Sequence, residues 1–168
     1  VWDIRLLQSS HKLNPSVEVT ADDSLALQGA ELVVNAIPTQ FVRSVWERVG
    51  GNCPAGVPVA CVSKGIEMQT LLRPSEIIEQ AIEHSGGGQP SVCALSGPTI
   101  ASELAEHKPA TMVAAADDDE VAACIQDAFL VKWLRVYKQD DLIGVELAGA
   151  TKNVIALAAG MIDGLLLG

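Results

Sequence analysis

ELVVNAIP at residues 31–38, VPVACVSKG at 57–65 and SVCALSGP at 91–98 are the stretches that decide the fold. Each is short, almost continuously apolar and rich in β-branched or small residues, and each ends at small or turn-forming residues. Strands without polar alternation suit a sheet that is covered on both faces, which is typical of parallel sheets. We therefore expect three buried, parallel strands.

Helical segments separate these strands. The sequence predicts helices at 22–28, 40–49 and 71–84, and the glycines at 86–88 end the last one. An alternation of strand and helix predicts the α/β class, with a doubly wound parallel sheet.

The second half of the chain continues the same order. We expect, in turn, a short helix at 101–106, a strand at 110–116, a helix at about 118–129, a strand at 134–138 and a long helix from about Ile143. The acidic run at 117–120 lies at the start of a predicted helix, where the helix dipole favours negative charge. We interpret it as a solvated helix start rather than a metal site.

Composition narrows the class of protein. The chain has 168 residues, 49% of them hydrophobic, which is enough for one globular domain with a core. Its 21 acidic and 11 basic residues give a net charge of −10, the wrong sign for following a nucleic-acid backbone. The most apolar region, 154–168, is interrupted by Asp163, so we expect no membrane span and a soluble, cytoplasmic protein.

Cysteine spacing and the two chain ends add two expectations. Cys53, Cys61, Cys93 and Cys124 show no paired CxxC spacing, so we interpret them as buried thiols in a reducing compartment and expect no metal site. The chain begins with VWDIR, which resembles the end of a strand, and stops at Gly168 inside an apolar helix. We therefore expect a fragment of a longer protein.

Parallel strands place their C-terminal ends at one edge of the sheet, where open α/β sheets bind ligands. Residues 36–38, 63–65 and 96–99 should meet there. Lys64 would bring a cation, and the turn from Gly97 to Thr99 would open a helix whose free N–H groups could hold an anion. The alternatives are a lysine that leaves the sheet into water and a threonine-capped helix start that binds nothing.

The last helix contains an unusual lysine. This helix is apolar all round, which predicts burial, yet it carries Lys152 in its middle. A buried ammonium needs an anionic partner, a ligand or a lowered pKa, unless its stem reaches the surface. Beside Lys64, a desolvated Lys152 would have a pKa lowered towards the range of a general base. With a doubly wound sheet, this suggests hydride transfer between a nicotinamide cofactor and an alcohol.

Three runs resemble one family in the same order and spacing. They are VSKGIE at 62–67, LSGPTIASEL at 95–104 and RVYKQDDLIGVELAGATKNVIALAAGMIDG at 135–164, and the sequence is similar to the bacterial type of NAD(P)-dependent glycerol-3-phosphate dehydrogenase. The resemblance implies a Rossmann-like dinucleotide-binding domain at 1–140, without its first strand and Gly-rich loop. It also implies that 141–168 begin an all-helical substrate domain.

The family's activity would be the interconversion of sn-glycerol 3-phosphate and dihydroxyacetone phosphate with NAD or NADP, which supplies glycerophospholipid synthesis. The resemblance implies that Lys152 is the catalytic proton acceptor and that Lys64 contacts both cofactor and substrate. By the same resemblance Gly97 and Thr99 would contact the substrate and Ala101 the cofactor. It is also compatible with a homodimer.

Some parts of the family pattern are missing from this sequence. No GxGxxG occurs in it, and the acidic residue and Arg-Asn pair that the family places further on would lie beyond Gly168. We therefore expect the fragment alone to be inactive. Asp3 could favour NAD by accepting the ribose 2′-hydroxyl, but the nearby Arg5 leaves that preference open. The alternatives are a non-catalytic nucleotide-binding domain and another hydroxyacid or sugar-nucleotide dehydrogenase of similar two-domain build.

Overall fold

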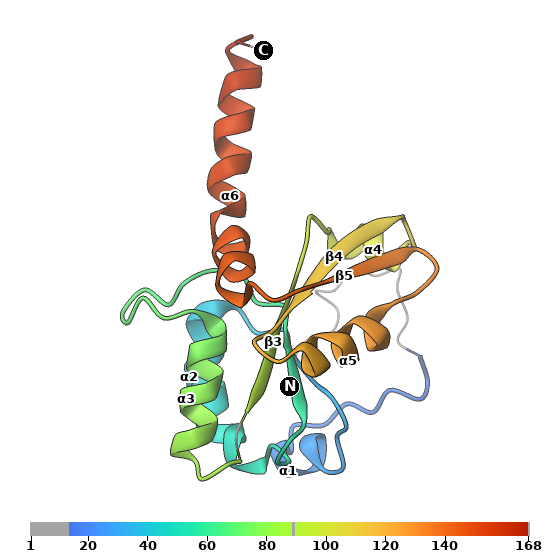
Figure 1. Cartoon of the computed structure of the whole chain (residues 1–168), viewed down its shortest axis with the longest axis vertical. Helices are drawn as coiled ribbons and strands as arrows, with labels where there is room; N and C mark the ends of the chain where they lie inside the picture. Colours follow the sequence, from blue (N-terminus) through green and yellow to red (C-terminus); the bar gives the residue numbers. More distant parts are fainter. Residues whose placement is uncertain (1–13, 89, 168) are drawn as a thin grey trace.

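A computed structural model describes residues 14–88 and 90–167. A five-stranded sheet is flanked by helices, and a long last helix extends away from one end of it (Figure 1). Asp3, Arg5 and the strand end expected at the start of the chain lie outside the described residues.

The sheet is mixed rather than wholly parallel. Its strands, in the spatial order β1-β2-β3-β4-β5, are β1 (Val33–Asn35), β2 (Pro58–Cys61), β3 (Ser91–Ser96), β4 (Ala110–Ala115) and β5 (Leu134–Gln139). The first three are parallel, as predicted, but β4 is antiparallel to β3 and parallel to β5. The expectation of a single parallel direction is therefore wrong for β4 and β5. A parallel neighbour needs a long crossover, and the connection at 97–109 holds only one short helix.

The helices lie close to their predicted positions. They are α1 (Asp23–Leu27), α2 (Thr39–Val49), the 3-10 turn η2 (Gly50–Asn52), α3 (Pro74–His84), α4 (Ala101–Ala105), α5 (Asp119–Phe129) and α6 (Leu142–Gly164). Helix α3 starts three residues later than predicted because Pro74 occupies its first position and holds Arg73 extended. Asp118 caps α5 by accepting from the Glu120 amide, which supports the interpretation of the acidic run as a helix start.

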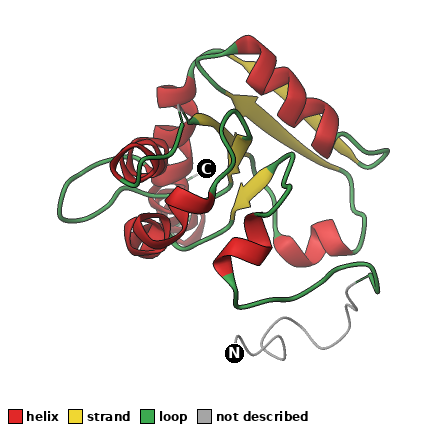
Figure 2. Ribbon diagram, turned by 90° about the horizontal axis from the view of Figure 1, so that it is seen from below, coloured by secondary structure: helices red, strands yellow, loops and turns green. Residues whose placement is uncertain are grey.

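Helices cover both sides of the sheet (Figure 2). On one side α2 and α3 pack on the first strands around Trp46 and Ile77. On the other side α5 packs on the later strands through Ile125, against Leu95 and Val136. These two apolar layers hold the C-terminal ends of β2 and β3 in place.

Helix α6 departs most from expectation. Only Leu142 and Glu146 are buried in it, and every residue from 151 to 164 is exposed. The helix packs against β3 and β4 with its first turns and then leaves the sheet (Figure 1). By length and composition the whole of α6 could cross a membrane, but core helices of soluble proteins meet the same criteria.

The cysteines follow the prediction except for one. All four are free, and Cys53, Cys61 and Cys93 are buried, but Cys124 is exposed on the outer side of α5. Within the described ranges, no group of His, Cys, Asp and Glu side chains is arranged to hold a metal ion.

Candidate functional site

The turns after β2 and β3 are joined by a lysine. The Lys64 amine donates a hydrogen bond of 2.8 Å to the carbonyl oxygen of Gly97. The same oxygen accepts a bond of 2.9 Å from the Thr99 backbone amide. The prediction that the C-terminal ends of parallel strands meet at one edge of the sheet is therefore confirmed for the Lys64 and Gly97 turns.

A buried polar network fixes the backbone around Lys64. Asn35 at the end of β1 accepts from the Trp46 indole at 2.9 Å and donates to the Ser63 hydroxyl at 2.8 Å. The Thr39 hydroxyl donates to the Lys64 carbonyl at 2.9 Å. Because buried polar groups need partners, these bonds allow few positions for the turn. Asn35 and Trp46 could not be singled out from the sequence, because their partners are far apart in the chain.

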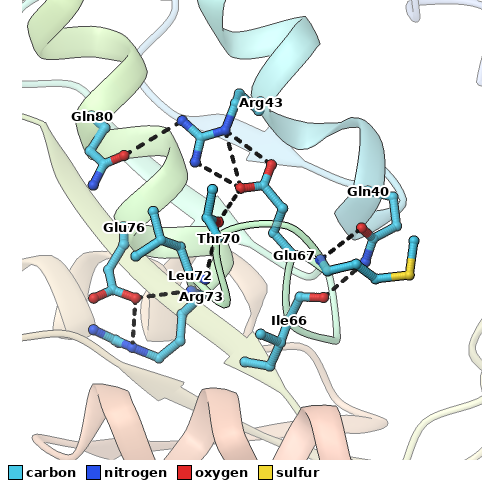
Figure 3. A network of polar contacts seen from close by, with 10 residues as sticks. Gln40, Arg43, Ile66, Glu67, Thr70, Leu72, Arg73, Glu76 and Gln80 are labelled. Carbon is cyan, nitrogen blue, oxygen red and sulfur yellow. Dashed lines mark hydrogen bonds and ion pairs between the residues drawn. The ribbon is translucent and has the colours of Figure 1, made fainter.

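The loop from Lys64 to Arg73 is held against α2 (Figure 3). The Gln40 amide donates to the Ile66 carbonyl at 2.8 Å and accepts from the Met68 amide at 3.1 Å. The Arg43 guanidinium donates to both carboxylate oxygens of Glu67, at 3.0 Å and 2.8 Å. The Thr70 hydroxyl also donates to Glu67.

Glycine is required sterically in the second turn. A Cβ on Gly97 would lie 2.9 Å from Met112 Cα and would also collide with the Thr111 carbonyl oxygen. Both are backbone atoms of β4, which cannot move independently of the sheet. The turn can therefore lie this close to β4 only with glycine at position 97.

Helix α6 closes the other side of a cavity of about 320 Å³ at these strand ends. Its lining residues are Lys64, Ser96, Gly97, Pro98, Val113, Val145, Ala148, Gly149, Lys152 and Ile155. A Cβ on Gly149 would lie 3.2 Å from the Ser96 hydroxyl oxygen and 3.5 Å from Lys64 Cγ. The small residues of α6 thus let it approach the stem of Lys64.

The electrostatics of the two lysines differ from the prediction. Burial lowers the pKa of Lys64, and the positive charge of Lys152 lowers it further. Lys152 itself is exposed, so the expectation of a buried Lys152 is wrong. Its part of α6 extends past the sheet, and the desolvated cation of the pair is Lys64.

Two predicted site residues lie beside the cavity rather than in its lining. Thr99 is half-buried and Ala101 is exposed at the start of α4. The helix cap is Ile100, which makes no side-chain capping bond, so the threonine-cap interpretation of Thr99 is wrong. A cap at position 99 would need the helix to begin one residue earlier.

Comparisons with known proteins agree on one family. The family model for the N-terminus of NAD-dependent glycerol-3-phosphate dehydrogenase matches residues 5–122, and the model for its C-terminus matches 141–168. Glycerol-3-phosphate dehydrogenase [NAD(P)+] of Anaeromyxobacter dehalogenans is 40% identical over 161 residues, which are 96% of this chain and 48% of that protein. The enzyme of the same name from Bacillus pumilus is 42% identical over 153 residues, covering 91% of this chain and 44% of its own.

A solved structure gives the same answer. The crystal structure of glycerol-3-phosphate dehydrogenase from Coxiella burnetii superposes with a TM-score of 0.81 at 28% identity, over 95% of this chain and 47% of that one. The chain therefore spans about half the length of the relatives it matches. Its strand-end cavity, the family-model matches and these relatives together show that the chain belongs to the NAD-dependent glycerol-3-phosphate dehydrogenase family.

Proposed function

We propose that this chain forms the dinucleotide-binding part, and the start of the helical part, of an enzyme that interconverts sn-glycerol 3-phosphate and dihydroxyacetone phosphate. The observation that carries the proposal is that Lys64 and Lys152, from two distant parts of the sequence, line one cavity at the ends of β2 and β3. Two cations there suit a substrate with a phosphate and a reacting oxygen.

The residues present fit one end of a nicotinamide cofactor. The cavity has an apolar wall made of Pro98, Val113, Val145, Ala148 and Ile155, which suits a flat ring more than a charged group. A nicotinamide ring bound there would supply hydride transfer to or from carbon 2 of the substrate. No GxGxxG motif for the pyrophosphate is present in the sequence, so the fit concerns the ring end of the cofactor.

The chain's own residues would bind the substrate and transfer the proton. Lys64, which donates to the Gly97 carbonyl, would contact the cofactor and the substrate oxygens. The turn at Gly97 and Thr99 would contact the three-carbon chain of the substrate. Lys152 would take the proton of the hydroxyl at carbon 2, and in the reductive direction its ammonium would return it. Ala101 at the start of α4 would contact the cofactor. An exposed Lys152 can exchange protons with water between turnovers.

The organisation of the whole enzyme follows from the same proposal. We place the boundary between the dinucleotide-binding domain and the helical substrate domain at 140/141, just before α6 begins at Leu142. The family-model match that starts at residue 141 supports this position. The enzyme would be cytoplasmic, act as a homodimer, use NAD or NADP, and supply glycerophospholipid synthesis.

The decisive experiment uses a full-length protein, in which this chain is joined to the family length that it does not span. Oxidation of NADH is followed by absorbance with dihydroxyacetone phosphate as substrate. Lys152→Ala should lower kcat about 10²- to 10⁴-fold, the usual contribution of a proton-transfer group, with little change in the Kd for NADH. Lys132→Ala, at an exposed lysine outside the cavity, is the matched control.

Three results would count against the proposal. Equal losses of kcat and cofactor affinity in Lys152→Ala would remove its role in proton transfer. A folded full-length protein that binds NADH but never oxidises it would favour the non-catalytic nucleotide-binding domain. Turnover of a hydroxyacid or sugar nucleotide instead would favour the other dehydrogenases.

A further inference from the structure

Glu146 is a buried carboxylate that does not line the cavity. Its side chain lies on the second turn of α6 and the residue is 6% exposed. One oxygen accepts from the Arg73 guanidinium at 2.7 Å and the Ser75 hydroxyl at 2.6 Å, and the other accepts from the Ser75 backbone amide at 2.9 Å. Burying a carboxylate is costly unless every such bond is made, so the geometry of these contacts is tightly constrained.

The partner of Glu146 is itself held in place. Arg73 precedes α3, and its backbone amide donates to Glu76 at 2.9 Å, while its guanidinium Nε lies 3.2 Å from the same carboxylate. Figure 3 shows that Arg73 ends the loop that Gln40 and Arg43 hold against α2. That loop starts at Lys64. A single ordered loop therefore carries Lys64 at one end and the attachment point of α6 at the other.

The attachment has a direct geometric consequence for Lys152. Lys152 follows Glu146 by six residues, which is about 9 Å along a helix. Between them lies Gly149, where an added Cβ would lie 3.5 Å from Lys64 Cγ, so α6 passes close to the stem of Lys64 at this point. Residues 151–164 of α6 are exposed, so the position of Lys152 in the described chain depends on the first two turns of the helix. In those turns Glu146 makes the polar attachment.

We propose that Glu146, gripped by Arg73 and Ser75, is a positioning residue that sets where Lys152 stands relative to Lys64. Its consequence for catalysis rests on the proposed function, whereas the placement of the two amines can be tested without it. The hydrogen bonds of Glu146 are made to Arg73 and Ser75, not to Lys64 or Lys152. Loss of these bonds should nevertheless change the distance between the two lysine amines, which is an effect distinct from a general loss of stability.

The first test measures the pKa of Lys64 in this 168-residue chain by NMR of its amine-bearing carbon. Lys152→Met should raise the Lys64 pKa, because the Lys152 charge lowers it. Glu146→Gln should also raise it, since a loosened α6 lets Lys152 move away. The sign is informative, because the direct effect of losing a carboxylate would be to lower the pKa of a nearby lysine. In the Lys152→Met background, Glu146→Gln should add no further rise.

The matched control is Glu79→Gln. Glu79 is a half-buried carboxylate on α3 that interacts electrostatically with Arg73 and Glu146 but makes no hydrogen bond or ion pair with α6 among the described contacts. Its loss should not raise the Lys64 pKa. The Trp46 indole proton, which is bonded to Asn35, reports whether the core stays folded in each variant. A folded Glu146→Gln chain whose Lys64 pKa is unchanged or lowered would overturn the proposal.

The second test uses the full-length protein. Glu146→Gln should lower kcat by up to about 10²-fold, the scale of a 1 Å misplacement, without a matching loss of NADH affinity. Glu146→Asp keeps the charge and should recover part of the rate. An active enzyme whose kcat ignores Glu146→Gln overturns the proposal. If instead the wild type is inactive while the Lys64 pKa responds as expected, the proposed function fails and the positioning role stands.

Discussion

The Lys64 amine reaches across the ends of two strands to the Gly97 carbonyl oxygen at 2.8 Å. This bond ties the turn after β2 to the turn after β3 and holds a cation over the cavity that α6 closes. Burial and the charge of Lys152 both disfavour that cation, so its presence lowers the stability of the fold. A residue that costs stability at such a place is typical of a functional site.

Lys64→Met should therefore change the pH dependence of stability. The Lys64 pKa is lowered in the folded state, so the unfolded chain binds this proton more tightly. The penalty is complete below the folded pKa and disappears above the ordinary value of 10.5. From pH 7 to 10 the wild type should gain free energy of unfolding relative to Lys64→Met, measured by urea denaturation. Lys132→Met, at an exposed lysine, should show no such trend. If the difference in free energy of unfolding between the wild type and Lys64→Met does not change with pH, the Lys64 pKa is not lowered in the folded chain.

The strand-end geometry could be predicted from sequence because it follows from a general rule. Apolar runs that end in SKG and SGPT indicate parallel strands, and parallel strands share one carboxyl edge. That rule predicts from the sequence alone that Lys64 lies beside Gly97. It could not give the direction of β4, because the direction depends on how the connection at 97–109 folds.

The exposure of Lys152 could not be predicted from the sequence, for a different reason. An apolar helix indicates a preference for burial, but the pattern does not say which surface will cover it. In the described chain α6 leaves the sheet after Gly149, so Lys64 rather than Lys152 is desolvated. The Glu146 attachment was missed too, because a glutamate in an apolar helix gives no sign of partners more than 70 residues away.

Gly97→Ala should destabilise the sheet. The new Cβ would lie 2.9 Å from Met112 Cα, so β3 and β4 would have to separate locally. Overpacking of this kind costs about 1–3 kcal/mol in the free energy of unfolding. Gly160→Ala is the control, because a Cβ on Gly160 meets nothing within 4 Å and alanine favours a helix. Urea denaturation compares the two, and equal stability of the variants would contradict the steric account.

Glu67→Gln should weaken the fold at neutral pH but much less in acid. The Arg43 hydrogen bond, followed by the Thr70 hydroxyl, lowers the pKa of Glu67 below its ordinary 4.5. Its stabilisation is therefore present above that ordinary value and is lost as the pH falls through the folded pKa. At pH 7 the substitution should cost about 1–3 kcal/mol, the scale of a charge-assisted hydrogen bond. Urea denaturation at pH 7 and about pH 3 measures the difference, with the exposed Glu47→Gln as control. A loss that is the same at both pH values would show that the ionised carboxylate contributes nothing.

The four thiols should react in two groups. Cys124 is exposed, whereas burial raises the pKa of Cys53, Cys61 and Cys93, the last to about 12. Since the thiolate is the reactive form, at pH 8 only about one Cys93 in ten thousand would be ionised. Iodoacetamide followed by mass spectrometry should modify Cys124 in the folded chain and all four cysteines in urea. Cys124→Ser should leave the folded chain almost unmodified. Rapid labelling of Cys93 without denaturant would mean that the sheet opens far more readily than its packing implies.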